Sequence, residues 1–217
     1  MMTWNDLSVW QYQQLYKVLK QTDKTNLDIL TEIISICEGY PIDEIDSWPF
    51  KDLIEKEKDY KFLEKLDFDK TAKKYIEANG KRYKFVHEIT EIPAARYIEA
   101  KHFIKEDFID NLHYLMASCV KPMRKTWRGW VEDKYDAKLH SQYAADMLKA
   151  KFVDIHNCVV FFYLLYAELI KSLRPYLTKE LMKVTNPENL DQVVTALQQI
   201  TDGFIVPSRL QNLKESA

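Results

Sequence analysis

The sequence predicts a mainly α-helical fold: a helical bundle with a central buried helix at about 152–173 and one inserted β-hairpin at about 73–89. Glycine is scarce, with 4 in 217 residues, and the abundance of Leu, Lys and Glu favours helices. Cys158 to Ala167 carry no formal charge, so a helix there would be apolar on every side and would need cover on every side. Asn79-Gly80 separates two runs of alternating apolar and polar residues, and hairpin turns prefer this pair because both positions need positive φ.

The central stretch is better explained by a buried helix than by two other structures. A membrane span needs about 20 apolar residues, and Asp154, His156 and Glu168 lie too close on either side of the apolar run. The β propensity of Val159–Tyr163 leaves a buried strand as an alternative. The length of the stretch and its flanking Glu, Lys and Ala residues favour a helix in a water-soluble bundle.

The residues before the hairpin predict a pair of helices. Asn5 or Ser8 can cap the first helix, and Gly39 can end the second. Together the two helices would form an antiparallel helical hairpin. Their expected inward-facing residues are Tyr12, Leu15, Tyr16 and Leu19 in the first helix, and Leu27, Leu30, Ile33, Ile34 and Cys37 in the second.

The segment between this pair and the β-hairpin predicts shorter helical pieces. Pro41–Pro49 indicates a short turn of helix, and Pro49 suits the first turn of a third helix. In that third helix Phe50, Leu53 and Ile54 are expected to face inward. The charged run Glu55–Lys61 is expected to be a solvated face or a bend.

After the β-hairpin the pattern is helical again. Pro93 begins one helix, and Asp107 can cap the next, which Pro122 would stop. Lys121–Trp130 has no periodicity and is predicted to be a connecting loop, after which Asp136 opens the helix that leads into the central one. The expected division is an N-terminal helical region (1–70), the β-hairpin (71–90), a C-terminal helical bundle (91–202) that ends with an amphipathic helix at 190–200, and an extended tail (203–217).

Composition indicates the class of protein. With 47% hydrophobic and 29% charged residues, the chain is typical of a globular protein with a substantial core. The net charge of −2 excludes a generally basic, nucleic-acid-binding surface. Cys37, Cys119 and Cys158 are widely spaced in apolar runs, which predicts buried free thiols in a reducing compartment. The N-terminal residues lack the basic and apolar regions of a secretory signal, so we expect cytosolic synthesis.

No motif in the sequence indicates catalysis or metal binding. The 5 histidines share no i, i+3 or i+4 spacing, and there is no CxxC or HExxH. GxSxG, P-loop and GxGxxG motifs do not occur either. A pair of carboxylates brought together in space stays open, but no spacing selects one. We therefore expect a non-enzymatic protein without a cofactor, in which His113 and His156 are core or boundary residues.

Lys121–Trp130 is the one segment with a clear chemical bias, because it contains four basic residues, two tryptophans and no acid. The candidate contact residues are Lys121, Arg124, Lys125, Trp127, Arg128 and Trp130. The rings can simply pack on the domain with the charges solvated, which is the commonest outcome. Arg and Trp also anchor protein interfaces, or can hold phosphates and stack on bases. Four charges make a small footprint for nucleic acid, so a protein interface is the favoured functional interpretation.

Three stretches together resemble a protein family. They are TWNDLSVWQYQQLYKVL, ANGKRYKFVHEITEIPAARYIEAKHF and NLHYLMASCVKP, in this order over roughly residues 3–122, with a looser match through 135–169. This arrangement resembles small proteins of tailed phages that infect Bacteroidetes. Pro93-Ala94-Ala95-Arg96 departs from the pattern, in which a Gln before the tyrosine is more usual.

The resemblance implies a non-enzymatic component of the virion of a crAss-like phage, in the connector or tail region. It implies no catalytic residues. Such a protein would be synthesised in the host cytoplasm, be located in the virion in several symmetry-related copies, and pack against portal, connector or tail subunits without contact to a membrane. The alternative is a tail-assembly chaperone of the host cytoplasm. A small nucleic-acid-binding protein that uses residues 121–130 is the less favoured third possibility.

Overall fold

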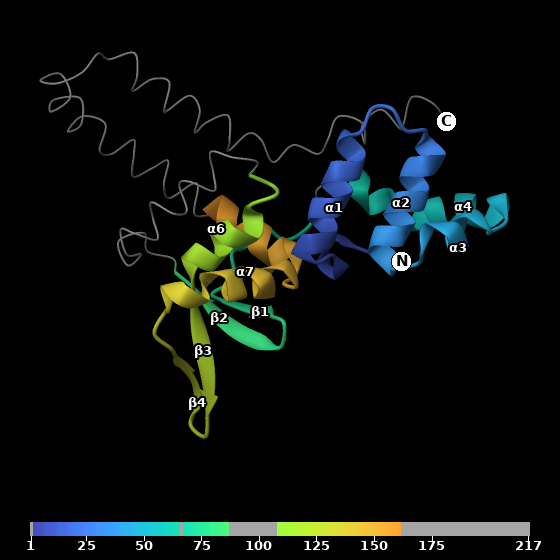
Figure 1. Ribbon diagram of the computed structural model, residues 1–217. Helices are drawn as coiled ribbons and strands as arrows, with labels where there is room; N and C mark the ends of the chain where they lie inside the picture. Colours follow the sequence, from blue (N-terminus) through green and yellow to red (C-terminus); the bar gives the residue numbers. More distant parts are fainter. Residues whose placement is uncertain (1, 66, 87–107, 162–217) are drawn as a thin grey trace, which may run out of the picture.

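The computed structural model describes residues 2–65, 67–86 and 108–161, and these form a mainly helical protein with a small antiparallel sheet (Figure 1). The expected helices near 93–106 and 190–200, the second half of the central helix and the tail lie outside the described residues. The described elements are η1 (Trp4–Asp6), α1 (Val9–Lys20), α2 (Asn26–Glu38), α3 (Ile42–Asp46), α4 (Phe50–Glu57), η2 (Lys58–Glu64), β1 (Tyr75–Ala78), β2 (Lys81–Phe85), α6 (Leu112–Cys119), β3 (Val120–Thr126), β4 (Gly129–Glu132), η4 (Ala137–Leu139) and α7 (His140–Leu148).

Side-chain caps define the first two helices. Ser8, rather than Asn5, caps α1: its hydroxyl accepts from the Gln11 N–H at 3.2 Å, and its own N–H donates to Gln11 Oε1 at 2.9 Å. Thr25 forms the same reciprocal pair with Asp28 at the start of α2. Gly39 ends α2 with a φ of 80°, a left-handed conformation that glycine adopts without strain. The predicted helical pair is confirmed, but Leu27, which was expected to face inward, is 42% exposed.

Two inward-facing predictions for the third helix are wrong. Phe50 and Ile54 are 65% and 42% exposed, and only Leu53 of the three is buried. Phe50, Leu53 and Ile54 share one side of α4, but only Leu53 is covered by the core, and apolar spacing does not show how far another element covers an apolar side. The charged run after it is mostly exposed helix, except that Tyr60 is buried and donates to Glu38 Oε1 at 2.7 Å.

The sheet has the order β1-β2-β3-β4, with every neighbouring pair antiparallel. Its first hairpin is the predicted one, and Asn79 and Gly80 have φ values of 52° and 72° as a type I′ turn requires. The expectation of a single hairpin is wrong, because the predicted loop 121–130 forms β3, a turn and β4. In this second turn only Gly129 has a positive φ, at 117°. The two turn residues, Trp127 and Arg128, therefore need no Asn-Gly pair, and the sequence does not signal the hairpin.

Pro122 lies inside β3, where a proline is disfavoured because it cannot donate a hydrogen bond. The Asp133 N–H donates to the Pro122 carbonyl at 2.8 Å, so this carbonyl faces the β4 side of the strand. In an antiparallel ladder the nitrogen and carbonyl of one residue face the same neighbour. The missing N–H therefore removes no hydrogen bond between β2 and β3, and the strand tolerates the proline.

Helices α6 and α7 pack together and against one face of the sheet. The strand residues on that face, Ile76, Ala78, Tyr83 and Phe85, are buried, and the Tyr83 ring lies 6.1 Å from that of Tyr143 in α7. The three cysteines are buried thiols that form no disulfide in the part of the chain that the structure describes, as predicted. Burial raises the pKa of Cys37 and of Cys158 to about 12, so both thiols are protonated at neutral pH.

Asp146 of α7 joins the first hairpin to the helices. Its side chain is almost fully buried, and its carboxylate accepts hydrogen bonds from Asn79 Nδ2 at 2.7 Å, from Lys81 Nζ at 2.8 Å and from the Tyr83 hydroxyl. Burial opposes ionisation of this group, but the three hydrogen bonds outweigh it and lower the pKa of Asp146. The three donors of the first hairpin therefore fix the β1–β2 turn on α7 through the Asp146 carboxylate.

The predicted central helix begins at Phe152 and is helical to the end of the described residues at 161. Residues 152–159 are all buried, so the expected cover on every side is present over this part. The Phe152 ring stacks on the Tyr12 ring with 3.8 Å between the ring centroids, and its centroid lies 5.6 Å from that of Trp4. These contacts join the N-terminal helices to the central helix. Antiparallel hydrogen bonds between Leu7–Val9 and Ala150–Phe152 connect the starts of α1 and of the central helix.

Replacing Asp146 by Asn should lower the free energy of unfolding by about 2 kcal/mol or more, because charge-assisted hydrogen bonds to a buried group are lost. Urea unfolding monitored by circular dichroism measures it, and Asp23→Asn, at an exposed position, is the control. The folded pKa of Asp146 lies below the unfolded value of about 3.9, so its contribution is present above that pH and is lost as pH falls through the folded pKa. Equal acid sensitivity of D146N and wild type would contradict this role.

Phe152→Ala should cost about 3–5 kcal/mol, because it removes the ring that contacts both Trp4 and Tyr12 and leaves a cavity. The matched control is Phe50→Ala, which removes a ring that is 65% exposed and should have little effect. Thermal and urea unfolding of the two variants give the comparison. Similar losses in both would show that the aromatic cluster does not hold the two parts together.

Candidate interaction site

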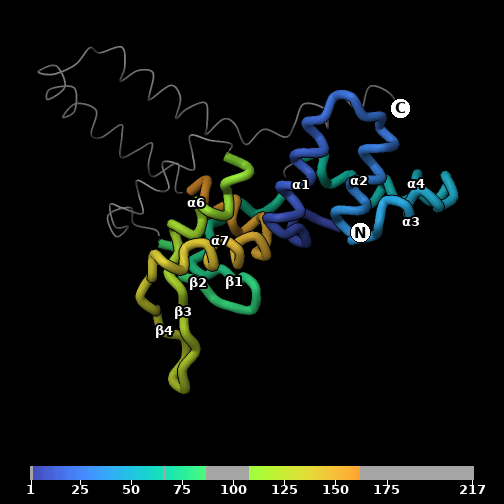
Figure 2. Tube along the Cα trace, viewed as in Figure 1, coloured from blue at the N-terminus to red at the C-terminus, as the bar shows by residue number. Residues whose placement is uncertain are grey.

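The hairpin formed by β3 and β4, which we call the arm (residues 120–132), extends away from the helices (Figures 1 and 2). All four residues of β4 are exposed. The turn at its tip exposes Trp127 to 87%, and Trp130 and Val131 are 38% and 46% exposed. Large apolar side chains therefore lie on an element that contributes little to the core.

The two faces of the arm differ in their side chains. The register places Val120, Pro122 and Arg124 on the face shared with the buried strand residues Tyr83 and Phe85. The opposite, outer face carries residues from all four strands. These outer-face residues are Tyr75, Glu77, Arg82, Lys84, Lys121, Met123, Lys125, Trp130 and Glu132. The outer face is therefore both basic and aromatic.

Arg82 of β2 connects the first hairpin to the arm. Its guanidinium lies 4.9 Å from the centre of the Trp130 ring and 5.7 Å from that of Tyr75, and it also pairs with Glu77. A cation over an aromatic face is attracted by the ring quadrupole. Arg82 thus holds Trp130 against the outer face, which is why this ring is less exposed than Trp127.

Each cation at the base of the arm has a carboxylate neighbour. Lys84 and Lys121 both approach Glu132, the latter at 3.9 Å, and Arg124 Nε lies 3.4 Å from Asp133. The hydrogen bond from Lys84 is the main cause that lowers the pKa of Glu132. At the tip the situation is different. Within the part of the chain that the structure describes, Lys125 and Arg128 have no carboxylate partner, and Arg128 lies 4.3 Å from the Trp127 ring.

The structure brings some of the predicted contact residues together and separates others. Lys125 lies directly opposite Trp130, and Arg128 covers Trp127. Lys121 and Arg124 lie toward the base, where each has a carboxylate neighbour. Sequence reasoning missed Tyr75, Arg82 and Lys84. The alternation of side chains along the two strands of the first hairpin puts these three residues on one face of the sheet. Only the pairing of β2 with β3 brings that face beside the arm, and the sequence does not show this pairing.

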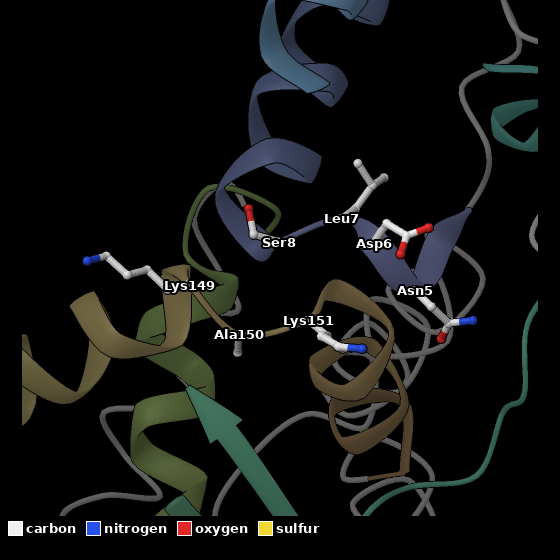
Figure 3. A pocket seen from close by; sticks show the side chains of 7 residues that line it. All are labelled: Asn5, Asp6, Leu7, Ser8, Lys149, Ala150 and Lys151. Carbon is white, nitrogen blue, oxygen red and sulfur yellow. The ribbon is translucent and has the colours of Figure 1, made fainter. Parts of the chain in front are cut away.

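A shallow pocket of about 220 Å³ lies where the starts of α1 and of the central helix meet (Figure 3). It is lined by Asn5, Asp6, Leu7, Ser8, Lys149, Ala150 and Lys151. The backbone here already forms hydrogen bonds from the Val9 N–H to the Ala150 carbonyl and from the Phe152 N–H to the Leu7 carbonyl. The carboxylate of Asp6 accepts a hydrogen bond from the Thr3 N–H at 2.8 Å. The pocket is a consequence of how the two segments join, and it brings no reactive set of side chains together.

Two histidines lie in or at the edge of the core. His156 is buried against the rings of Phe68 and Phe152, as predicted, and burial lowers its pKa. His113 is half-buried and accepts from Gln13 Nε2 at 3.1 Å, and burial lowers its pKa to about 4. In the described ranges no three His, Cys, Asp or Glu side chains are grouped as a metal site would need. Every helix in those ranges is too short or too polar to cross a bilayer.

Comparison with protein-family models, with curated proteins and with solved structures finds no match.

Trp127→Ala should change the free energy of unfolding by less than about 0.5 kcal/mol, because the ring is 87% exposed. Trp4→Ala is the matched comparison: this ring is 5% exposed, donates to the Lys65 carbonyl at 2.8 Å and should cost about 3–5 kcal/mol. Urea unfolding followed by far-ultraviolet circular dichroism measures both without using tryptophan fluorescence. A large loss in W127A would mean that the tip serves stability.

Proposed function

We propose that this chain is a non-enzymatic binding protein that acts through the arm, and that it is a structural or packaged component of a bacteriophage virion. The observation that carries the first part is the exposure of Trp127, Trp130 and Val131 on a hairpin that extends from the body. Tryptophan and arginine dominate the energetics of protein interfaces because they bury a large area when a partner covers them. Keeping such rings in water has an energetic cost that binding to a partner would offset.

The second part of the proposal rests on the sequence resemblance to small proteins of tailed phages. It places the protein in the connector or tail region, where several symmetry-related copies would pack against portal, connector or tail subunits. A mainly helical body with a short extended arm suits this role, because the body can occupy a fixed position while the arm reaches a neighbour. The arm begins at the end of the matched stretch, and of its contact residues only Lys121 lies within that stretch, so the resemblance assigns no role to the others.

A tail-assembly chaperone is the alternative, and the same exposed rings would then cover an aggregation-prone tail protein before assembly. The two functions differ in where the protein is found. A virion component stays in purified particles, whereas a chaperone binds its client in infected cells and is absent from mature virions.

Mass spectrometry of purified particles of the encoding phage should detect the protein in mature virions. In a phage complemented with variants, replacement of both Trp127 and Trp130 by Ala should reduce its amount per particle by about tenfold or more, because hot-spot rings each contribute about 2 kcal/mol. Trp10→Ala is the control, since Trp10 is 48% exposed but lies on α1, away from the arm. Absence from virions together with co-purification with a tail protein from infected cells would favour the chaperone.

A further inference from the structure

The distribution of charge on the arm points to the chemistry of its partner. We infer that the tip, defined as Lys125, Trp127, Arg128 and Trp130, binds an acidic segment of a partner protein, with carboxylates on the two cations and apolar groups on the two rings. This inference rests on the proposed function, and it adds the class of partner.

The first step is the contrast between the base and the tip. Cations at the base already have carboxylates: Arg124 has Asp133, while Lys84 and Lys121 share Glu132. The two tip cations have none among the described residues, so no carboxylate in that part of the chain competes there with one from a partner. A partner with carboxylates at this place would complete the pattern that the base of the arm already shows.

The second step is the position of these cations beside the rings. Arg128 lies over the face of Trp127, and Lys125 is the direct cross-strand neighbour of Trp130. A segment that covers the rings would exclude water from the cations, which strengthens their attraction to carboxylates. Acidic and apolar residues that alternate along one segment would fit both requirements.

The third step separates a protein from a nucleic acid. Glu77 and Glu132 lie on the outer face itself, and Asp133 follows directly, so a polyphosphate backbone would meet three carboxylates. The two tip cations, which have no carboxylate partner among the described residues, would neutralise about two phosphates, and this gives a shallow salt dependence and weak binding. Discrete carboxylates of a protein segment can reach the tip without passing Glu77, Glu132 and Asp133.

The test uses the full chain to select peptides from a random display library. Selected peptides should be enriched in Asp and Glu combined with apolar residues, and this enrichment should be lost for the double variant Lys125→Glu, Arg128→Glu. The matched control is Lys51→Glu, Lys58→Glu, which makes the same change in net charge at exposed positions of the N-terminal helices. This control should select the same acidic peptides as wild type.

An affinity measurement with one selected peptide then gives the magnitude. Fluorescence anisotropy should show binding about tenfold weaker for the tip variant and unchanged for the control, since the tip variant replaces two attractive charge pairs by repulsive ones. A short oligothymidylate is measured in parallel. Selection without enrichment in acids, equal weakening in both double variants, or tighter binding of the oligonucleotide than of the peptide would each overturn the inference.

The same variants distinguish this inference from the proposed function. If replacement of Trp127 and Trp130 depletes the protein from particles while the tip charge reversal does not, the arm is an interface whose partner is not acidic. If neither change affects incorporation but the acidic peptides still require Lys125 and Arg128, the binding chemistry stands, and it is the part of the arm in incorporation that fails.

Discussion

The carboxylate of Asp146 lies where the sheet meets the helices, and the position of the arm depends on the donors that hold it. Asn79, Lys81 and Tyr83 reach this carboxylate from the turn and the second strand of the first hairpin. A buried charge is stable only when its hydrogen bonds are made, so the hairpin has one preferred position on α7. Because β3 pairs with β2, the arm inherits its orientation from this contact.

The first turns of the central helix show a related constraint. Residues 152–159 are buried on all sides, yet Asp154, His156 and Asn157 are polar. Asp154 pairs with Lys73 at 2.8 Å, and Asn157 Nδ2 donates to the Asp69 and Thr71 carbonyls at 2.6 and 3.3 Å. The polar groups therefore bind the connector that leads into β1, while Phe152 packs on Trp4 and Tyr12. One helix thus positions the start of the sheet and the N-terminal helices together.

The features that were predicted correctly are those that depend on neighbouring residues in the sequence. The cap at Ser8, the left-handed Gly39 and the Asn79-Gly80 turn each depend on a few neighbouring residues, and the structure confirms all three. The second hairpin was missed because its positive φ occurs at Gly129 after an ordinary Trp-Arg turn, and because Pro122 argues against an inner strand. The prediction for Phe50 is wrong because spacing shows that a helix has an apolar side but does not show whether another element covers that side.

The candidate site was predicted only in part, because composition is a local signal and strand pairing is not. Composition identified the segment with the two tryptophans, but the role of each cation depends on pairing between distant strands. Pairing makes Arg124 and Lys121 part of a compensated base, and it brings Arg82 onto Trp130. At the tip, Lys125 and Arg128 flank exposed rings and have no carboxylate neighbour in the ranges that the structure describes. A base stabilised by its own ion pairs can hold these four side chains away from the body without help from a partner, and this leaves them available for binding.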